Sequence, residues 1–185
     1  MVFVTDFADQ AVLLPVMLVV AQCVWMSGWK RGAAAWLVGV GGTLMVTLFL
    51  KLAFLSCGSD EALRSPSGHT AAAAVICGGL MTVLAGKPRW AVPTAVLAAL
   101  LIGGSRLALG AHTSLEVVVG ATAGILGAAS IALLAGPIHH FQRKRTVAAV
   151  AVVLLLLHGM RMPAEAHIRQ FARQVAHFIP ACHES

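Results

Sequence analysis

Long apolar stretches recur along almost the whole chain. A helix needs about 20 apolar residues to cross the hydrocarbon core of a bilayer. Charged residues gather mainly between six stretches that approach this length, at residues 10–28, 33–57, 67–86, 90–109, 112–136 and 146–160. The chain is 59% hydrophobic and only 11% charged, which excludes an ordinary soluble domain. We therefore predict an all-α fold, a polytopic membrane bundle of about six transmembrane helices.

The sixth stretch and the tail are the least regular part of this pattern. Residues 146–160 are short for a full crossing, so they either span a thinned bilayer or form a re-entrant segment. Beyond them, the pattern of an amphipathic surface helix is formed by Ile168, Phe171, Val175 and Phe178 opposite Arg169, Arg173 and His177. We predict a transmembrane domain over 1–160 and an amphipathic tail over 161–185, which anchors the chain or covers the site entrance.

Basic residues are unevenly divided between the two sides that alternating crossings would create. One side collects Lys30, Arg31, Lys87, Arg89, Arg143, Lys144 and Arg145. Cytoplasmic loops carry an excess of Lys and Arg, so this side is predicted to be cytoplasmic. Segments 58–66 and 106–112 then face the periplasm or exterior. Because the chain is compact and rich in Ala and Val, we expect the inner membrane of a bacterium.

The net charge of +6 does not indicate a nucleic-acid partner. The basic residues sit in short loops beside predicted spans, where topology and anionic lipid headgroups account for them. We expect membrane lipids as partners, and the sequence leaves the oligomeric state open. Asp6 and Asp9, without Lys or Arg in the first ten residues, do not match a signal peptide, so we expect the first helix to be retained.

A short polar segment, Ser65-Pro66-Ser67-Gly68-His69-Thr70, leads directly into the third stretch. Ser67 suits the N-cap position of the helix that follows. The backbone N–H groups and positive dipole end of such a helix attract phosphate, and Gly68 lets an anion approach the backbone. The sequence therefore predicts an anion site at the start of this helix.

A second polar segment joins the fourth and fifth stretches. Ser105 and Arg106 close the fourth, while His112 and Glu116 open the fifth. Residues four apart share one face of a helix, so the Glu116 carboxylate can hold the His112 imidazole in one tautomer. Polar side chains in membrane segments usually face a cavity inside the protein. Because these residues and Lys51 lie near the outer ends of different helices, we predict a single polar site.

Together the two segments resemble the motifs of the type-2 phosphatidic acid phosphatase superfamily, Pro-Ser-Gly-His followed by Ser-Arg, five residues, His, three residues and Asp. The resemblance implies that His112 attacks phosphorus to form a phosphohistidine and that His69 protonates the leaving oxygen. It also implies that Arg106, Ser67 and the Gly68 backbone bind the phosphoryl oxygens, which suits phosphoryl transfer. The family works without a metal, so we expect no metal and no other cofactor.

The chain departs from the family pattern at two places. Glu116 stands where the family has Asp and is one methylene longer. The family's first motif, Lys followed after six residues by Arg-Pro, keeps only Lys51, because Gly58 and Ser59 occupy the Arg-Pro positions. The resemblance implies that Lys51 binds phosphate. Arg64 either replaces the missing arginine at the phosphate or is a solvated loop charge.

These observations predict an integral membrane lipid phosphatase. Its substrate would be a lipid phosphomonoester or diphosphate, such as undecaprenyl diphosphate, phosphatidylglycerol phosphate or phosphatidic acid. One alternative is a phosphotransferase that passes phosphate from His112 to a second lipid. Another is a catalytically silent lipid-binding or scaffold protein, which the missing Arg-Pro pair favours and the retained histidines and Arg106 oppose.

Two residue types are predicted to have structural roles. The four tryptophans fall near predicted span ends and are expected in an interfacial belt, namely Trp25, Trp29, Trp36 and Trp90. Cys23 and Cys77 are expected to pack as small buried groups. Cys57 and Cys182 could form a disulfide if both lie on the oxidising outer side.

Overall fold

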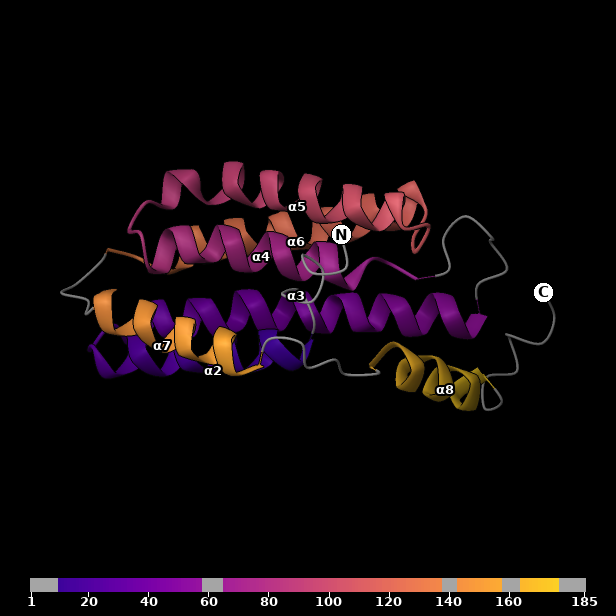
Figure 1. Cartoon of the computed structure of the whole chain (residues 1–185), viewed down its shortest axis with the longest axis horizontal. Helices are drawn as coiled ribbons and strands as arrows, with labels where there is room; N and C mark the ends of the chain where they lie inside the picture. Colours follow the sequence, from indigo (N-terminus) through magenta and orange to yellow (C-terminus); the bar gives the residue numbers. More distant parts are fainter. Residues whose placement is uncertain (1–9, 58–64, 138–142, 158–163, 177–185) are drawn as a thin grey trace.

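The structure, a computed structural model, describes residues 10–57, 65–137, 143–157 and 164–176 (Figure 1). These residues form helices and the turns between them, with no strand in any of the described ranges, which confirms the all-α fold class. The helices are α2 (Gln10–Met26), α3 (Lys30–Cys57), α4 (Gly68–Val83), the short 3-10 helix η1 (Pro88–Trp90), α5 (Ala91–Ala108), α6 (Ser114–Leu134), α7 (Arg143–Leu157) and α8 (Ala164–Ala176).

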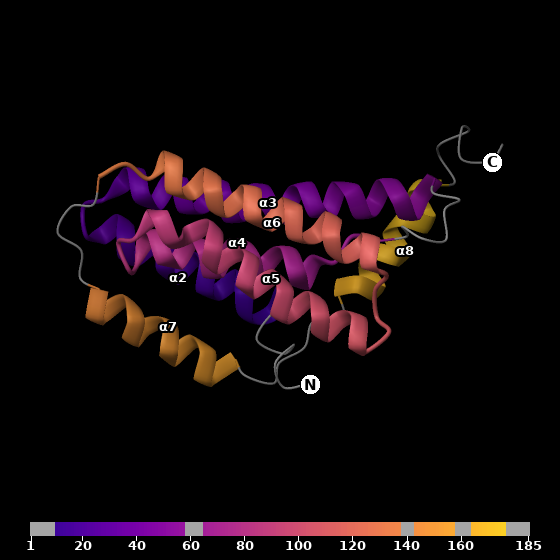
Figure 2. The same ribbon diagram turned by 90° about the horizontal axis from the view of Figure 1, so that it is seen from above.

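Helix α4 is the centre of the bundle. It packs against α3, α5 and α6, and most of its residues are buried. Helix α2 packs against both α3 and α7, and in the view from above it lies beneath α4 and α5 (Figure 2). Helix α8 packs against α3. Since α4 carries the Pro-Ser-Gly-His segment at its N-terminus, the surrounding helices hold that segment in place.

Small residues allow α4 and α6 to approach closely. A Cβ atom added at Gly124 would overlap the carbonyl oxygen of Ala71, and one added at Gly120 would overlap the carbonyl oxygen of Ser67. Lipid tails are as apolar as leucine, so close backbone packing replaces the hydrophobic effect as the source of helix association in a membrane. The α4–α6 contact therefore depends on glycine at these two positions.

We expect Gly124→Ala to destabilise the bundle by about 1 to 3 kcal/mol, because the new methyl group forces α4 away from α6. Thermal unfolding in detergent would measure the loss. The matched control is Gly104→Ala on α5, where a Cβ atom meets nothing within 4 Å. That change should be neutral or stabilising, since alanine favours helices over glycine, and equal unfolding temperatures for the two variants would contradict the packing argument.

Helices occupy all six predicted stretches. Within the ranges that the structure describes, three of them are long and apolar enough to cross a membrane by length and composition: Lys30–Leu55, Pro88–Ala108 and Ser114–Leu134. The apolar helices Val12–Met26 and Gly68–Val83 are shorter. At 17 and 16 residues, α2 and α4 measure about 26 and 24 Å, somewhat less than a typical hydrocarbon core. Three helices could therefore span a membrane, and the predicted number of about six spans is not confirmed.

The sixth predicted stretch differs most from its expected form. Helix α7 ends at Leu157 and begins at Arg143, so its first turn contains Arg143, Lys144 and Arg145. The apolar part that remains, 146–157, is roughly 18 Å long as a helix. It packs against α2 and the core through Val150, Val153 and Leu154. A full crossing by α7 stays a prediction.

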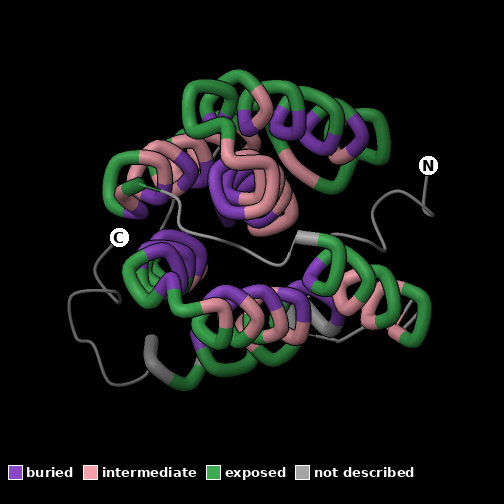
Figure 3. Tube along the Cα trace, turned by 90° about the vertical axis from the view of Figure 1, so that its left-hand side faces the viewer, coloured by how far each residue is buried: buried purple, intermediate pink, exposed green. Residues whose placement is uncertain are grey.

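The outer surface of the bundle is apolar. Seen along the bundle, buried positions face inward and exposed positions lie on the outside (Figure 3). Large side chains among the exposed ones include Leu97, Leu100, Leu101, Leu126 and Leu133. An exposed apolar surface of this extent is unusual for a soluble monomer, and together with the three long apolar helices it fits a membrane protein.

The expectation of a tryptophan belt is wrong for two of the four residues. Trp36 is completely buried and donates from Nε1 to the carbonyl oxygen of Met17 at 2.9 Å. Trp29 is also buried and donates to the carbonyl oxygen of Ala135 at 3.1 Å. Only Trp25 and Trp90 are about half exposed, as a belt requires. The Trp36 indole thus ties α3 to α2, and the Trp29 indole ties the residue before α3 to the C-cap of α6.

The cysteines also differ from expectation. Cys23 and Cys77 are free thiols, but both are half-buried rather than fully buried. The side chain of Cys57 and all of Cys182 lie outside the described residues, so the disulfide remains a prediction. The predicted helix in the tail is confirmed by α8, in which Ala172 is buried and Phe171 is half exposed. The position of α8 on a membrane surface stays a prediction.

Candidate active site

Four helix ends meet at one end of the bundle, on the right in Figure 1. They are the C-terminal ends of α3 and α5 and the N-terminal ends of α4 and α6. The candidate residues within the described ranges all lie at or within about two turns of these ends. The fold therefore brings Lys51 and both polar segments to the same end of the molecule.

Ser67 is the N-cap of α4, as predicted. Its side-chain oxygen accepts a hydrogen bond from the backbone N–H of Thr70 at 3.4 Å and lies 2.9 Å from the Thr70 hydroxyl. The residue is fully buried. Capping by a serine side chain fixes the first turn of the helix, so Gly68 and His69 begin α4 in a defined orientation with the positive end of the helix dipole beneath them.

His112 and Glu116 are in contact, but not in the way that we predicted. Nδ1 of His112 lies 2.9 Å from Oε2 of Glu116. The two residues do not share a helix face, because α6 begins only at Ser114 and Thr113 is its N-cap. Instead the carboxylate folds back past the start of the helix. Gly110, with φ of 61°, makes the tight turn that brings His112 there from the end of α5.

The Glu116 carboxylate holds several backbone groups as well as the imidazole. Oε2 also accepts from the Thr113 N–H at 3.1 Å, and Oε1 accepts from the Ser65 N–H at 2.7 Å. The Thr113 hydroxyl accepts from the Glu116 N–H in return, which completes a capping box. The Glu116 carbonyl oxygen accepts from the Ser67 N–H at 2.9 Å. Glu116 therefore fixes both the histidine and the segment before α4.

Lys51 reaches the same segment from α3. It is only 4% exposed, and its Nζ donates to the Ser65 hydroxyl at 2.9 Å. A Cβ atom at Gly68 would lie 3.5 Å from Lys51 Cε, so the lysine stem passes beside the first residue of α4. A buried ammonium is costly unless it is hydrogen-bonded or faces an anion. Its position fits the predicted role in phosphate binding.

Arg106 occupies the last turn of α5 and is half-buried. Its Nε is buried and, among the described residues, has no hydrogen-bond partner; the same holds for the hydroxyl of neighbouring Ser105. Leaving a buried donor unpaired costs roughly 1 to 3 kcal/mol, and more for a charged group. Ala111 N donates to the Arg106 carbonyl oxygen at 3.0 Å, which ties this turn to the one that carries His112. An anion between these groups would pair the guanidinium.

Two predicted residues are less completely placed. His69 is the second residue of α4 and is half-buried, so it lies in the turn that the Ser67 cap fixes. Arg64 lies outside the described residues, together with Gly58 and Ser59. Whether Arg64 replaces the missing family arginine stays a prediction.

Sequence reasoning missed Ser65 and Thr113. The spacing Thr113-Ser-Leu-Glu116 is the signature of a capping box and could have placed the start of α6 correctly. No local pattern identifies Ser65 as the residue between Lys51 and Glu116, because those contacts span 14 and 51 positions in the chain.

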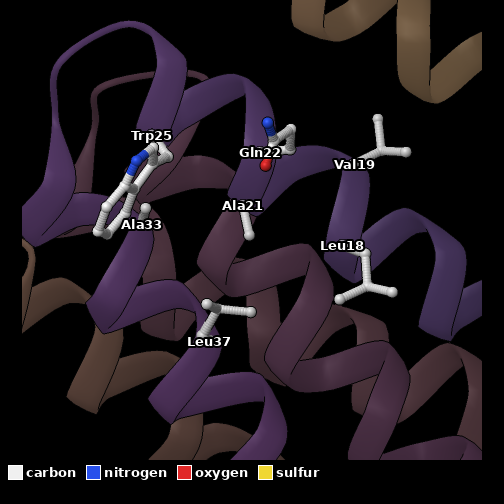
Figure 4. A pocket seen from close by; sticks show the side chains of 7 residues that line it. All are labelled: Leu18, Val19, Ala21, Gln22, Trp25, Ala33 and Leu37. Carbon is white, nitrogen blue, oxygen red and sulfur yellow. The ribbon is translucent and has the colours of Figure 1, made fainter.

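A groove elsewhere in the described part of the bundle has a different, apolar character. An apolar groove of about 390 Å³ lies between α2 and α3, toward the opposite end (Figure 4). Its walls carry no titratable side chain and consist of Leu18, Val19, Ala21, Gln22, Trp25, Ala33 and Leu37. Within the part of the chain that the structure describes, no three His, Cys, Asp or Glu side chains are grouped as metal ligands.

Comparison with known families agrees with this geometry. The family model of the PAP2 superfamily, the type-2 phosphatidic acid phosphatases, matches residues 45–139, just over half of the chain. The chain belongs to this superfamily, and the resemblance seen in its motifs is confirmed. The superfamily generally comprises phosphatases, so the chain has a phosphatase-type fold. Its family supports a phosphoric ester hydrolase in general. No significant match was found among curated proteins or solved structures.

Proposed function

We propose that the chain is an integral membrane phosphatase that hydrolyses a lipid phosphomonoester or diphosphate through His112. The contact between Nδ1 of His112 and the Glu116 carboxylate carries this proposal. A carboxylate on Nδ1 favours the tautomer with the proton on that nitrogen, which leaves the lone pair of Nε2 for attack. The ring is only 9% exposed and lies at the end of the bundle where Lys51 and Arg106 are also found.

In the proposed reaction, a bond forms between Nε2 and the terminal phosphorus while the bond from that phosphorus to the leaving oxygen breaks. The leaving oxygen is the lipid hydroxyl oxygen in a phosphomonoester and the bridging oxygen of the lipid monophosphate in a diphosphate. His69 gives a proton to the leaving oxygen and then removes one from the water that hydrolyses the phosphohistidine. The N-terminus of α4 at Ser67 and Gly68, with Lys51, Arg106 and Arg64, would hold the phosphoryl oxygens. No step requires a metal, so the activity should persist in EDTA.

The position of the site supports a lipid substrate. The four helix ends lie at one edge of a bundle whose outer surface is apolar, so a headgroup could reach His112 while its acyl chains stay in the bilayer. The distribution of basic residues favours the outer side of a bacterial inner membrane. We propose that residues 1–160 form the membrane phosphatase domain and that 161–185 form an amphipathic tail, whose helix α8 packs against α3.

Phosphate release by the detergent-purified protein tests this function. The panel should contain undecaprenyl diphosphate, phosphatidylglycerol phosphate, phosphatidic acid and a water-soluble phosphomonoester, all with EDTA. Release from at least one lipid in preference to the soluble ester is expected. Transfer of phosphate to an added acceptor lipid instead would support a phosphotransferase, and inertness toward every substrate would favour a silent scaffold.

Arg106→Ala should lower kcat/KM by about 10- to 100-fold and weaken inhibition by orthovanadate, because the guanidinium is expected to pair with phosphoryl oxygens. Steady-state kinetics on the preferred lipid would measure both effects. Arg89→Ala is the matched control, since Arg89 is exposed in η1 at the other end of the bundle. Equal kinetics for the two variants would remove Arg106 from the site.

A further inference from the structure

One residue touches both buried charges that belong to the candidate site. Ser65 accepts a hydrogen bond from Lys51 Nζ through its hydroxyl at 2.9 Å. It donates its backbone N–H to Glu116 Oε1 at 2.7 Å. Glu116 in turn holds His112 through Oε2. A continuous hydrogen-bonded chain therefore runs from α3 to the imidazole, and Ser65, which is 4% exposed, is its central member.

We propose that Ser65 is a positioning residue that holds Lys51 toward the phosphate site and separates it from Glu116. This inference rests on the proposed phosphatase function. Ser65 precedes the Pro-Ser-Gly-His motif and was not among the residues that the sequence singled out. Its two polar groups have different tasks, because the hydroxyl fixes the lysine while the backbone N–H fixes the carboxylate.

The need for such a residue follows from the charges. Lys51 has a flexible four-carbon stem and a compact ammonium group, so it can take several positions within its reach. An opposite charge nearby in a poorly solvated interior attracts it strongly. If the ammonium turned to the Glu116 carboxylate, it would compete with His112 Nδ1 for the same acceptor and leave the N-terminus of α4. The Ser65 hydroxyl gives it a partner beside Gly68 instead.

This role differs from that of an ordinary turn residue. If Ser65 only stabilised the loop, its replacement by alanine would lower the unfolding temperature. Any change in kcat and KM would then be the same whether or not Lys51 is present. A serine that acts through Lys51 affects phosphate binding specifically. Its effect should disappear once Lys51 has been removed, since coupled residues are not additive.

The experiment compares Ser65→Ala, Ser65→Thr, Lys51→Ala and the double variant Ser65→Ala/Lys51→Ala with the wild type. Ser65→Ala keeps the backbone N–H that holds Glu116 but removes the hydroxyl that holds Lys51. We expect kcat/KM for the preferred lipid phosphate to fall roughly 10- to 100-fold, mainly through KM, with a parallel loss of orthovanadate affinity. Ser65→Thr should restore most of both, and Ser65→Ala should cost nothing further in the Lys51→Ala background.

Ser130→Ala controls for removal of a serine hydroxyl, because Ser130 donates to the Leu126 carbonyl oxygen at an exposed position of α6. Wild-type KM and orthovanadate affinity in Ser65→Ala would overturn the proposal, as would full additivity with Lys51→Ala. If the wild type releases no phosphate from any substrate, the phosphatase function fails separately. Direct calorimetric binding of orthovanadate to wild type and Ser65→Ala then decides, and equal affinities overturn the role of Ser65.

Discussion

Replacing His112 by alanine should reduce lipid phosphate release by a factor on the order of 10³ or more. The variant loses the only atom that the mechanism assigns to attack on phosphorus, Nε2 of an imidazole whose Nδ1 is held by Glu116. Binding should suffer less than turnover, because the groups expected to hold the phosphoryl oxygens remain. Phosphate release under saturating substrate measures the loss, and orthovanadate inhibition or calorimetry measures binding.

His167→Ala is the matched control for this variant. His167 lies on α8 and is exposed, so its removal should leave turnover and stability close to those of the wild type. Substantial turnover by a correctly folded His112→Ala protein would exclude His112 as the nucleophile. A loss of the same size in both variants would point to a general effect on the preparation.

Glu116→Gln should cause the second largest loss, on the order of 10² to 10⁴ in kcat. The amide removes the negative charge that stabilises a cationic imidazole. It also places an N–H₂ group where the carboxylate now accepts from His112, Thr113 or Ser65. Because three donors point at the two carboxylate oxygens, an amide cannot accept from all of them. Kinetics on the preferred lipid and thermal unfolding would separate the catalytic loss from the structural one.

Glu116→Asp is the informative companion, since Asp is the residue at this position in the family pattern. One methylene is lost, so the shorter carboxylate should not span from His112 to the Ser65 N–H while the Glu116 backbone holds Ser67. We expect activity between that of Glu116→Gln and the wild type. Full activity in Glu116→Asp would show that the contact with Ser65 has no catalytic consequence.

The helical architecture was largely predictable, because apolar length is a local property of the sequence. The predicted stretch 90–109 corresponds closely to α5 at Ala91–Ala108. Burial was less predictable, and Trp36 shows why. The indole N–H of Trp36 donates to the carbonyl oxygen of Met17 on α2, so this polar group is hydrogen-bonded inside the protein. A position near a span end cannot reveal such a partner, since it depends on how two helices pack.

The sequence predicted that the candidate residues within the described ranges lie at one end of the bundle, but it did not predict how they are connected. The interval between His112 and Glu116 predicted their contact correctly, although the reason given, a shared helix face, was wrong. The predicted stretch began at residue 112, but the capping box at Thr113 starts α6 at Ser114. The Glu116 carboxylate therefore turns back toward His112. The link from Lys51 through Ser65 depends on the packing of α3 beside α4, which no spacing rule encodes.

Trapping the covalent intermediate tests the central claim most directly. Wild-type protein would be mixed with its preferred lipid phosphate, quenched in alkali to preserve a phosphorus–nitrogen bond, and digested for mass spectrometry. We expect phosphate on the peptide that contains His112, with none on the same peptide from His112→Ala. Turnover with no phosphorylated peptide, or phosphate on another residue that persists in His112→Ala, would contradict a histidine phosphatase at this site.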